Sequence, residues 1–365
     1  MKKKIYFLLL AIFFVSPFLF VSCSDDDDDP DINPDPELTT SGVYILNNGS
    51  YGQNNSTLDY YNPETNELTK KVFNTSNGRG LGDTANDLLV YGSKMYIVVN
   101  VSSTIEITDL EAGSLQTISL TRDEQPQQPR FAQPHKGKVY VTTYDGYVVK
   151  IDTTSLEVEG QVEVGLGAEQ LSIVGDKLYT AVSGYMTPMT KVAEVDLTTF
   201  TKTKDFEVIV APRWMQADKN GNLYVMSAGN YADIKQTVQK LDTKTGETKV
   251  ICEDEYVSMT LAGDYLYIIS AKTDSETWSP IDAKYLKYNV ETETMEEKEF
   301  VNSSVEINYP TYLDVDPVTE QIYITAGLAT NTGDVYIVSP EGDLVNKVEL
   351  SGYNPVCSRF LTILE

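Results

Sequence analysis

Histidine and basic residues are scarce in this chain of 365 residues. His135 is the only histidine, so a multi-histidine metal site, a haem pair or a histidine relay elsewhere in the chain cannot be assembled. Lysine and arginine number 28 against 54 aspartates and glutamates, a formal net charge of -26. Because phosphate groups are bound by clustered lysine and arginine, this composition disfavours nucleic acid and anionic membrane surfaces as partners.

Cysteine is also rare, with residues only at Cys23, Cys252 and Cys357. We expect Cys252 and Cys357 to be buried thiols, since free cysteine behaves as a small apolar side chain. A bridge between them is the alternative, because an exported protein meets oxidising conditions.

The first 23 residues have the layout of an export signal. Three lysines precede an apolar run from Ile5 to Val21, which is marginal in length for a bilayer span and ends next to Cys23. This layout resembles a bacterial lipoprotein signal and implies that Cys23 is lipidated, although Phe20 and Ser22 depart from the usual residues before the cysteine. A plain cleaved signal or an uncleaved anchor is the alternative.

The segment after Cys23 is acidic and rich in proline. Residues 24–29 read SDDDDD and resemble the export tag of Bacteroidota lipoproteins, which implies a lipid anchor in the outer membrane and exposure on its extracellular face. A solvated acidic linker is the blander interpretation. We therefore expect a signal peptide at 1–22, a disordered tether at 23–40 and a folded part at 41–365.

The folded part is too long for one ordinary compact core, which leaves two domains or a repeat. Tyrosine is unusually common, with 24 residues against 11 phenylalanines, and seven short strand-like runs end on a tyrosine. These runs are Gly42–Tyr44, Lys94–Tyr96, Lys138–Tyr140, Lys177–Tyr179, Asn222–Tyr224, Tyr265–Tyr267 and Gln321–Tyr323. Their spacing of about 46 residues is typical of propeller blades.

A second hairpin, closed by Asp or Asn in a Thr-rich turn, follows each tyrosine, as at Asp152, Asp196 and Asp242. Four strands in each of seven units predict an all-β, seven-bladed β-propeller with antiparallel blades. The last strand, Pro355–Leu364, should be the innermost strand of a closing blade whose other three strands come from residues 42–73. Such closure by both termini removes exposed sheet edges. No helical segment of useful length is expected.

The strand, Asp, Thr-rich turn pattern resembles the YncE-like propellers over residues 42–365, and it lacks the signatures of WD40, kelch and sialidase blades. The opening segments Gly42–Gly52 and Asn55–Thr65 resemble the start of a Bacteroidota surface lipoprotein group, the DUF5074 or BtuG-like cobalamin-binding propellers. The resemblance implies capture of vitamin B12 or related corrinoids outside the cell. It also implies delivery of the corrinoid to a TonB-dependent outer-membrane transporter.

Loops at one face of a propeller gather around its axis, and ligands usually bind there. The candidate ligand-binding residues on this face are Tyr51, Arg79, Gln128, Arg130, Gln170, Tyr185, Arg213, Trp214, Tyr231, Trp278, Tyr309 and Tyr353. Arg130 and Arg213 could instead fix loops, Trp214 could plug the axis, and several of the loop tyrosines could be surface residues. Trp278 is expected in a long loop, Ala271–Ala283, with no core to fill.

Catalysis has little support in the sequence. His135 is expected in a solvated turn on the opposite face, and the recurring aspartates are explained by turn closure. We therefore expect a binding protein and not an enzyme, with no cofactor apart from a transported corrinoid. A glycan-binding surface lipoprotein is the main alternative, and a surface-layer or protein-interaction propeller without a small ligand is the third.

Overall fold

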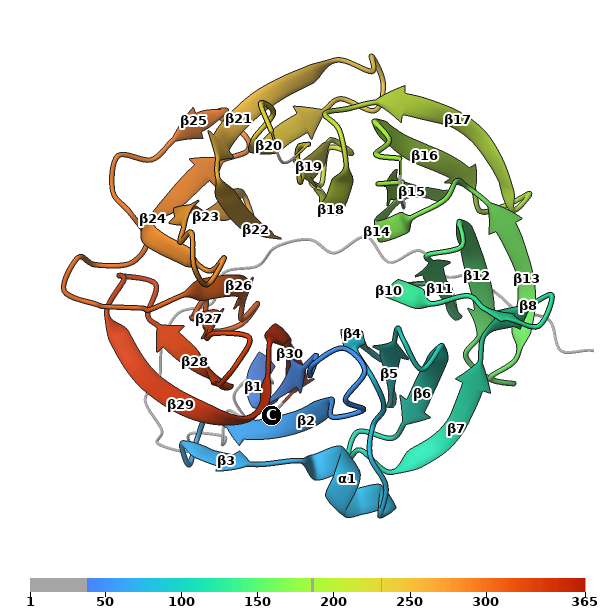
Figure 1. The fold of residues 1–365 in the computed structure, drawn as a ribbon, viewed down its shortest axis with the longest axis horizontal. Helices are drawn as coiled ribbons and strands as arrows, with labels where there is room; N and C mark the ends of the chain where they lie inside the picture. Colours follow the sequence, from blue (N-terminus) through green and yellow to red (C-terminus); the bar gives the residue numbers. More distant parts are fainter. Residues whose placement is uncertain (1–37, 185–186, 231, 365) are drawn as a thin grey trace, which may run out of the picture. The chain divides into compact units, whose positions relative to one another are not determined.

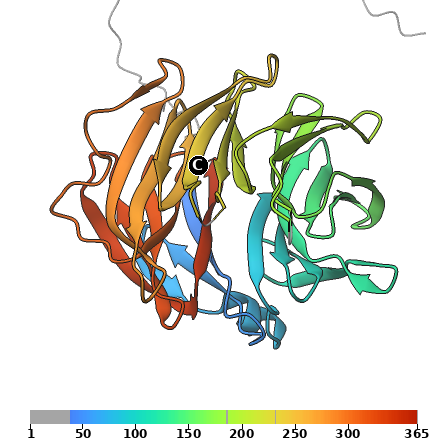
Figure 2. The same cartoon turned by 45° about the horizontal axis from the view of Figure 1, so that its top comes forward.

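A computed structural model describes residues 38–184, 187–230 and 232–364. Seven antiparallel four-stranded sheets, or blades, are arranged in a ring (Figures 1 and 2). The predicted seven-bladed β-propeller is therefore confirmed. The expected signal peptide, the lipidated Cys23 and most of the tether lie outside the described residues.

The first three blades follow one another along the chain. Blade 1 comprises β4 (Ala85–Tyr91), β5 (Lys94–Val99), β6 (Thr104–Thr108) and β7 (Ser114–Ser119). Blade 2 comprises β10 (Pro129–His135), β11 (Lys138–Thr143), β12 (Tyr147–Asp152) and β13 (Val158–Glu163). Blade 3 comprises β14 (Ala168–Val174), β15 (Lys177–Val182), β16 (Lys191–Asp196) and β17 (Thr201–Glu207).

The next three blades repeat this order from the axis outward. Blade 4 comprises β18 (Pro212–Ala217), β19 (Leu223–Ser227), β20 (Gln236–Leu241) and β21 (Thr248–Asp254). Blade 5 comprises β22 (Tyr256–Ala262), β23 (Tyr265–Thr273), β24 (Pro280–Asn289) and β25 (Thr294–Met295). Blade 6 comprises β26 (Pro310–Val315), β27 (Ile322–Ala326), β28 (Thr332–Val338) and β29 (Leu344–Tyr353).

Blade 7 joins the two ends of the folded chain, as predicted. It comprises the innermost strand β30 (Pro355–Leu364), followed outward by β1 (Leu38–Asn47), β2 (Thr57–Asn62) and β3 (Glu67–Thr69). The strand β1 begins at Leu38, three residues before the expected start of the folded part, because Leu38, Thr39 and Thr40 pair with the end of β30.

The sequence pattern behind each blade is visible in its local contacts. Asp152 closes its turn through Oδ1, which accepts hydrogen bonds from the backbone N–H of Thr154 at 2.9 Å and of Ser155 at 2.7 Å. Asp196 and Asp242 accept the same pair of backbone bonds in their own turns. The structure thus confirms the turn-closing role predicted for the recurring aspartates.

The core lies between neighbouring blades. The seven recurring tyrosines all lie on the second strands, and all are buried: Tyr44, Tyr96, Tyr140, Tyr179, Tyr224, Tyr267 and Tyr323. Tyr44 of blade 7 donates its hydroxyl to the carbonyl of Leu110, which follows β6 of blade 1. A tyrosine can fill such an interface because its large ring packs among apolar side chains, and in Tyr44 the hydroxyl also has an acceptor.

Two elements depart from the expected pattern. A short helix of six residues, α1 (Val72–Asn77), follows β3 and begins within residues 42–73, the range expected to supply three strands of blade 7. A small extra hairpin, β8 (Thr121–Arg122) and β9 (Gln125–Pro126), separates blades 1 and 2. Within the described ranges, no helix is long and apolar enough to cross a membrane.

The ring closes through a charged cluster on the innermost strands. Arg359 of β30 donates from Nη2 to Asp87 Oδ1 of blade 1 at 2.9 Å and from Nη1 to Asp314 Oδ1 of blade 6 at 3.0 Å. Its Nε donates to the backbone carbonyl of Leu88 at 2.7 Å. Burial raises the pKa of both carboxyl groups, while the Arg359 charge acts in the opposite direction. One guanidinium therefore links the last strand to the blades on either side of it.

A second cluster supports the same seam farther from the axis. Asp59 of β2 is fully buried and accepts hydrogen bonds from Asn47 Nδ2 at 3.0 Å, Lys71 N at 2.8 Å and Ser351 N at 2.8 Å. Since Ser351 belongs to β29, this carboxylate ties blade 7 to blade 6. A buried charge is tolerated where hydrogen-bond donors surround it in this way.

We expect Arg359→Leu to destabilise the propeller by about 3 kcal/mol, because it leaves two carboxylates without their common partner. The triple variant Arg359→Leu, Asp87→Asn, Asp314→Asn should regain part of that loss, since the uncompensated charges are gone. Urea unfolding followed by circular dichroism measures both. A stability of Arg359→Leu within 1 kcal/mol of wild type would show that the cluster does not hold the seam.

Candidate functional site

A cavity of about 720 Å³ lies on the propeller axis. Side chains from the innermost strand of every blade line it, together with residues 277–280 at the β23–β24 turn. Figure 1 shows these seven strands (β4, β10, β14, β18, β22, β26 and β30) nearest the axis. The face that carries the β23–β24 turn, here called the loop face, is the one expected to bind ligands.

One wall of the cavity is aromatic. Trp214 of β18 and Tyr312 of β26 lie with their ring centroids 5.8 Å apart and their planes tilted by 53°. Tyr256 of β22 lines the same wall and donates its hydroxyl to the carbonyl of Thr311. These rings offer flat apolar area to a ligand.

The other wall is polar. Arg130 of β10 donates from Nε to Glu169 Oε2 at 2.8 Å and from Nη1 to Asn86 Oδ1 at 2.7 Å. Asn86 in turn donates from Nδ2 to the carbonyl of Arg130 at 2.6 Å. These bonds hold the guanidinium in one orientation at the cavity wall.

Several polar side chains on the inner strands also join neighbouring blades. Gln170 Oε1 accepts the backbone N–H of Met215 at 2.6 Å, and Gln216 accepts that of Leu261. Asp87 and Asp314 accept the backbone N–H of Ala132 and Ser358 in the same manner. Amides and carboxylates at these positions therefore both line the cavity and hold the ring together.

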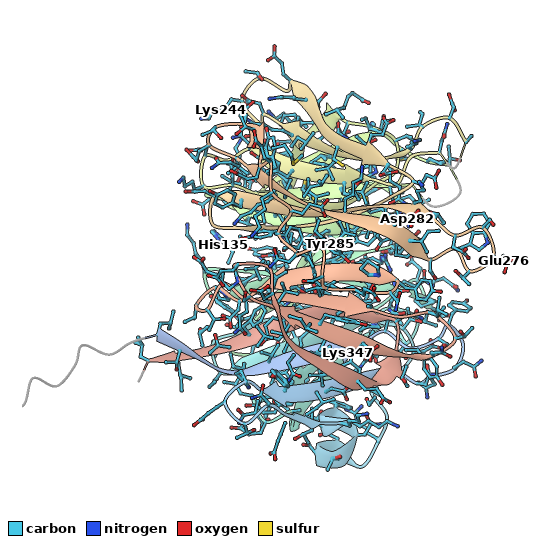
Figure 3. The ribbon with its side chains drawn as sticks, turned by 90° about the vertical axis from the view of Figure 1, so that its left-hand side faces the viewer. His135, Lys244, Glu276, Asp282, Tyr285 and Lys347 are labelled. Carbon is cyan, nitrogen blue, oxygen red and sulfur yellow. The ribbon has the colours of Figure 1, made fainter. Side chains whose placement is uncertain are left out.

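Trp278 lies at the mouth of the cavity. Its side chain is 79% exposed, and its backbone φ of 59° is in the left-handed region, which is unusual for a large residue. The long loop predicted at Ala271–Ala283 is wrong, because β23 continues to Thr273 and β24 begins at Pro280. In Figure 3, Glu276 and Asp282 mark this side of the molecule, and His135 lies on the other side.

The cavity brings together five of the twelve predicted ligand residues: Arg130, Gln170, Arg213, Trp214 and Trp278. Tyr185 and Tyr231 lie outside the described residues. The structure places the remaining five beyond the cavity wall: Tyr51, Arg79, Gln128, Tyr309 and Tyr353.

Arg79 is engaged elsewhere, on blade 1. It forms two hydrogen bonds with the buried carboxylate of Glu106, at 2.8 and 3.0 Å, and its guanidinium lies 4.9 Å from the ring centroid of Phe73. Tyr51 is 81% exposed at the β1–β2 turn on the loop face. Arg79 therefore has a structural role, whereas Tyr51 remains accessible to a partner.

The other three residues shape loops through their backbones. Gln128 donates its N–H to Ser103 Oγ at 3.1 Å, and the carbonyl of Tyr309 accepts the N–H of Gly327 at 3.1 Å. Tyr353 is the last residue of β29, and its carbonyl accepts the N–H of Gly49 at 3.0 Å.

Several cavity residues were not among the predicted ones. They are Asn86, Gln133, Gln216, Tyr256, Tyr312, Asp314 and Arg359. Strand alternation could have indicated Gln216, because a residue two positions along a strand faces the same side and Gln216 follows the predicted Trp214 in this way.

The described residues outside the cavity offer few reactive groupings. Nε2 of His135, the last residue of β10, lies 3.0 Å from Asp176 Oδ1. No cluster of three or more His, Cys, Asp or Glu that could hold a metal occurs in the described part of the chain. A second cavity of about 800 Å³, between blades 7 and 1, is lined by Tyr44, Tyr60 and mainly uncharged residues. It contains none of the predicted ligand residues.

The chain belongs to the DUF5074 family, described as a domain of unknown function, whose sequence model matches residues 41–359. No curated protein matches the chain.

Solved structures with this fold come from several bacteria. A quinonprotein alcohol dehydrogenase-like protein from Bacteroides thetaiotaomicron is 16% identical, with a TM-score of 0.60 over 88% of this chain and 78% of that one. A protein from Lactobacillus plantarum is 15% identical, with a TM-score of 0.61 over 88% and 100%. Virginiamycin B lyase from Staphylococcus aureus is 12% identical, with a TM-score of 0.52 over 86% and 100%. At these identities the similarity shows the propeller fold alone.

The two downstream cysteines are free thiols in different surroundings. Cys252 is half-buried on the outer strand β21, and burial raises the pKa of its thiol. Cys357 lines the cavity floor but is only 4% exposed, and burial raises the pKa of its thiol to about 12.

We expect Cys357 to resist modification by a thiol reagent at pH 8, because the thiolate is the reactive form and a pKa of about 12 keeps almost all of it protonated. The measurement is the rate of labelling in the folded unit 38–365, which lacks Cys23, with the Cys252→Ser variant isolating Cys357. Unfolding in urea should release the full reactivity. Rapid labelling in the native Cys252→Ser protein would contradict the burial of this thiol.

Proposed function

We propose that this protein is a non-enzymatic binding lipoprotein of the outer cell surface that captures a corrinoid in the axial cavity and passes it to a TonB-dependent transporter. The observation that carries the proposal is the pairing of an aromatic wall with an amide and guanidinium wall in one cavity on the axis. The family membership is consistent with it, since the opening segments resemble the cobalamin-binding propellers.

The chemistry of the cavity suits such a guest. A corrinoid is a flat macrocycle fringed by carboxamides, so its faces can pack on rings such as Trp214 and Tyr312. Its amide oxygens can accept hydrogen bonds from guanidinium and amide donors, and its amide N–H groups can donate to the oxygens of Gln133 or Asn354. Trp278 at the mouth can cover the part of the corrinoid that protrudes from the cavity.

The position of the first strand supports an orientation for delivery. Thr40 near the start of β1 donates to Asp316 Oδ1 at 2.7 Å, and Asp316 follows β26 at the face opposite Trp278. A tether joined to Leu38 therefore starts on the side away from the cavity mouth. A lipid anchor at Cys23 would leave the mouth free to meet both ligand and transporter.

Glycan capture is the second candidate, and the exposed Trp278 favours it. Tryptophan and tyrosine rings also stack on the faces of pyranoses, and amides bond sugar hydroxyls. The two ligands differ in size and shape, so direct binding separates them.

Calorimetric titration of the folded unit 38–365 with cyanocobalamin and cobinamide tests the proposal, because the ring and its core close within these residues. We expect Trp214→Ala to weaken corrinoid binding by tenfold or more, about 1.4 kcal/mol, through loss of the aromatic wall. Tyr51→Ala is the matched control, since Tyr51 is an exposed aromatic on the same face but outside the cavity.

Each outcome has a different consequence. Stoichiometric heat that Trp214→Ala reduces and Tyr51→Ala leaves unchanged supports corrinoid capture in the axial cavity. Heat with oligosaccharides alone would indicate that the cavity binds glycans and not corrinoids. No heat with either ligand class would leave protein interaction as the function of the loop face.

A further inference from the structure

The charged groups around the axial cavity balance one another. The lining carries three guanidinium groups, Arg130, Arg213 and Arg359, and the carboxylates Asp87 and Asp314. Glu169 is 2% exposed directly behind Arg130 and supplies a third carboxylate. The formal charges of this set therefore cancel, although donor hydrogens remain at the wall.

Arg130 lines the wall as part of an ion pair with Glu169, and the pair has no net charge. Its Nε and Nη1 are held by Glu169 at 2.8 Å and Asn86 at 2.7 Å, and Nη2 takes part in neither bond. Glu169 is fixed in turn by Ser183, whose hydroxyl donates to Oε1 at 3.3 Å. A ligand that enters the cavity meets an oriented donor whose charge Glu169 already compensates.

At the cavity floor, too, carboxylates compensate the charge of an arginine. Arg359 lies between Asp87 and Asp314, at 2.9 and 3.0 Å, so two carboxylates surround one guanidinium. An anionic ligand group would have to compete with these bonds or lie beside the carboxylates. Either alternative costs free energy in a partly desolvated site.

The negative charge on the exterior of the protein also disfavours anionic ligands, and it acts at longer range. The chain has a formal net charge of -26, and exposed acids such as Glu276 and Asp282 stand near the cavity mouth (Figure 3). Such a field lowers the local concentration of anions. Cations are attracted by the exterior but meet arginine side chains at the wall.

We propose that the axial cavity selects ligand groups that are uncharged and rich in hydrogen-bond acceptors, such as carboxamides, and discriminates against the matching carboxylates. The inference rests on the proposed function only for the choice of ligand. Its physical basis is the internal compensation of Arg130 by Glu169 and of Arg359 by Asp87 and Asp314.

The direct test compares cyanocobalamin with its monocarboxylic acid derivatives, in which one side-chain amide has become a carboxylate. For wild type, we expect the acids to bind at least tenfold more weakly. Glu169→Gln removes the charge that compensates Arg130, so the preference for the amide should fall by about tenfold. Equal or tighter binding of every acid by wild type overturns the inference, and so does an unchanged ratio in Glu169→Gln.

Glu106→Gln is the matched control. Glu106 is also a nearly buried carboxylate that pairs with an arginine, at 2.8 Å, but the pair lies outside the cavity. Glu106→Gln changes the net charge by the same amount as Glu169→Gln. If both substitutions shift the ligand preference equally, the shift comes from overall charge, which would contradict a local role for Glu169.

A test without ligand keeps the inference separable from the proposed function. The chain has two tryptophans, and both line the cavity, so Trp278→Phe leaves Trp214 as a single reporter on the wall. We expect acrylamide to quench Trp214 more strongly than iodide. Adding Glu169→Gln should raise quenching by iodide about twofold and leave acrylamide unchanged.

The two experiments fail in distinguishable ways. If neither cyanocobalamin nor its acid derivatives bind, the corrinoid proposal is overturned. The quenching result then decides the charge inference. Iodide quenching that equals acrylamide quenching, or that does not respond to Glu169→Gln, overturns the charge inference whatever the ligand.

Discussion

Closure of the ring depends on contacts near the propeller axis, where Arg359 of blade 7 bonds to blades 1 and 6. A propeller whose last blade is assembled from both termini must hold a strand from one end of the chain against three strands from the other. Backbone pairing between β30 and β1 joins the two ends of the chain, but it acts within blade 7 only. Arg359 extends it to blades 1 and 6 through Asp87 and Asp314. Arg359 therefore bonds to the blades on both sides of the seam, and the Asp59 cluster adds a second connection between blades 7 and 6.

The same inner-strand positions line the axial cavity and join neighbouring blades. Gln170 and Gln216 each use the side-chain oxygen to accept a backbone N–H of the next blade, and Gln216 also donates from Nε2 to Thr260 Oγ1 at 3.4 Å. Arg130 is similarly shared between Glu169, Asn86 and the cavity. These three side chains are thus hydrogen-bonded before any ligand arrives, as buried polar groups usually are. Binding here uses groups already held in place, which lowers the entropy lost on association.

The sequence predicted the fold well because its signals are local and repeated. Each blade carries a buried tyrosine on its second strand, and six of the seven also carry a turn-closing Asp or Asn, whereas blade 6 has Ser339 in that turn. The site was predicted less well, because lining the cavity depends on the register of seven separate strands. Trp214 was found by residue type, but Gln216, two positions further along the same strand, was not. Arg79, in the segment before β4, lies outside the cavity because it pairs with Glu106 of β6, and that pairing cannot be seen in the sequence.

Charge acts on ligand choice at two ranges in this molecule. The acidic exterior works through the solvent, where salt screens it over about 8 Å at physiological ionic strength. The cavity works by contact, where Glu169, Asp87 and Asp314 lie within 3.0 Å of the guanidinium groups that they compensate. Salt therefore weakens the first effect much more than the second. Discrimination that persists at high salt belongs to the cavity, and the part that salt removes belongs to the surface of the propeller.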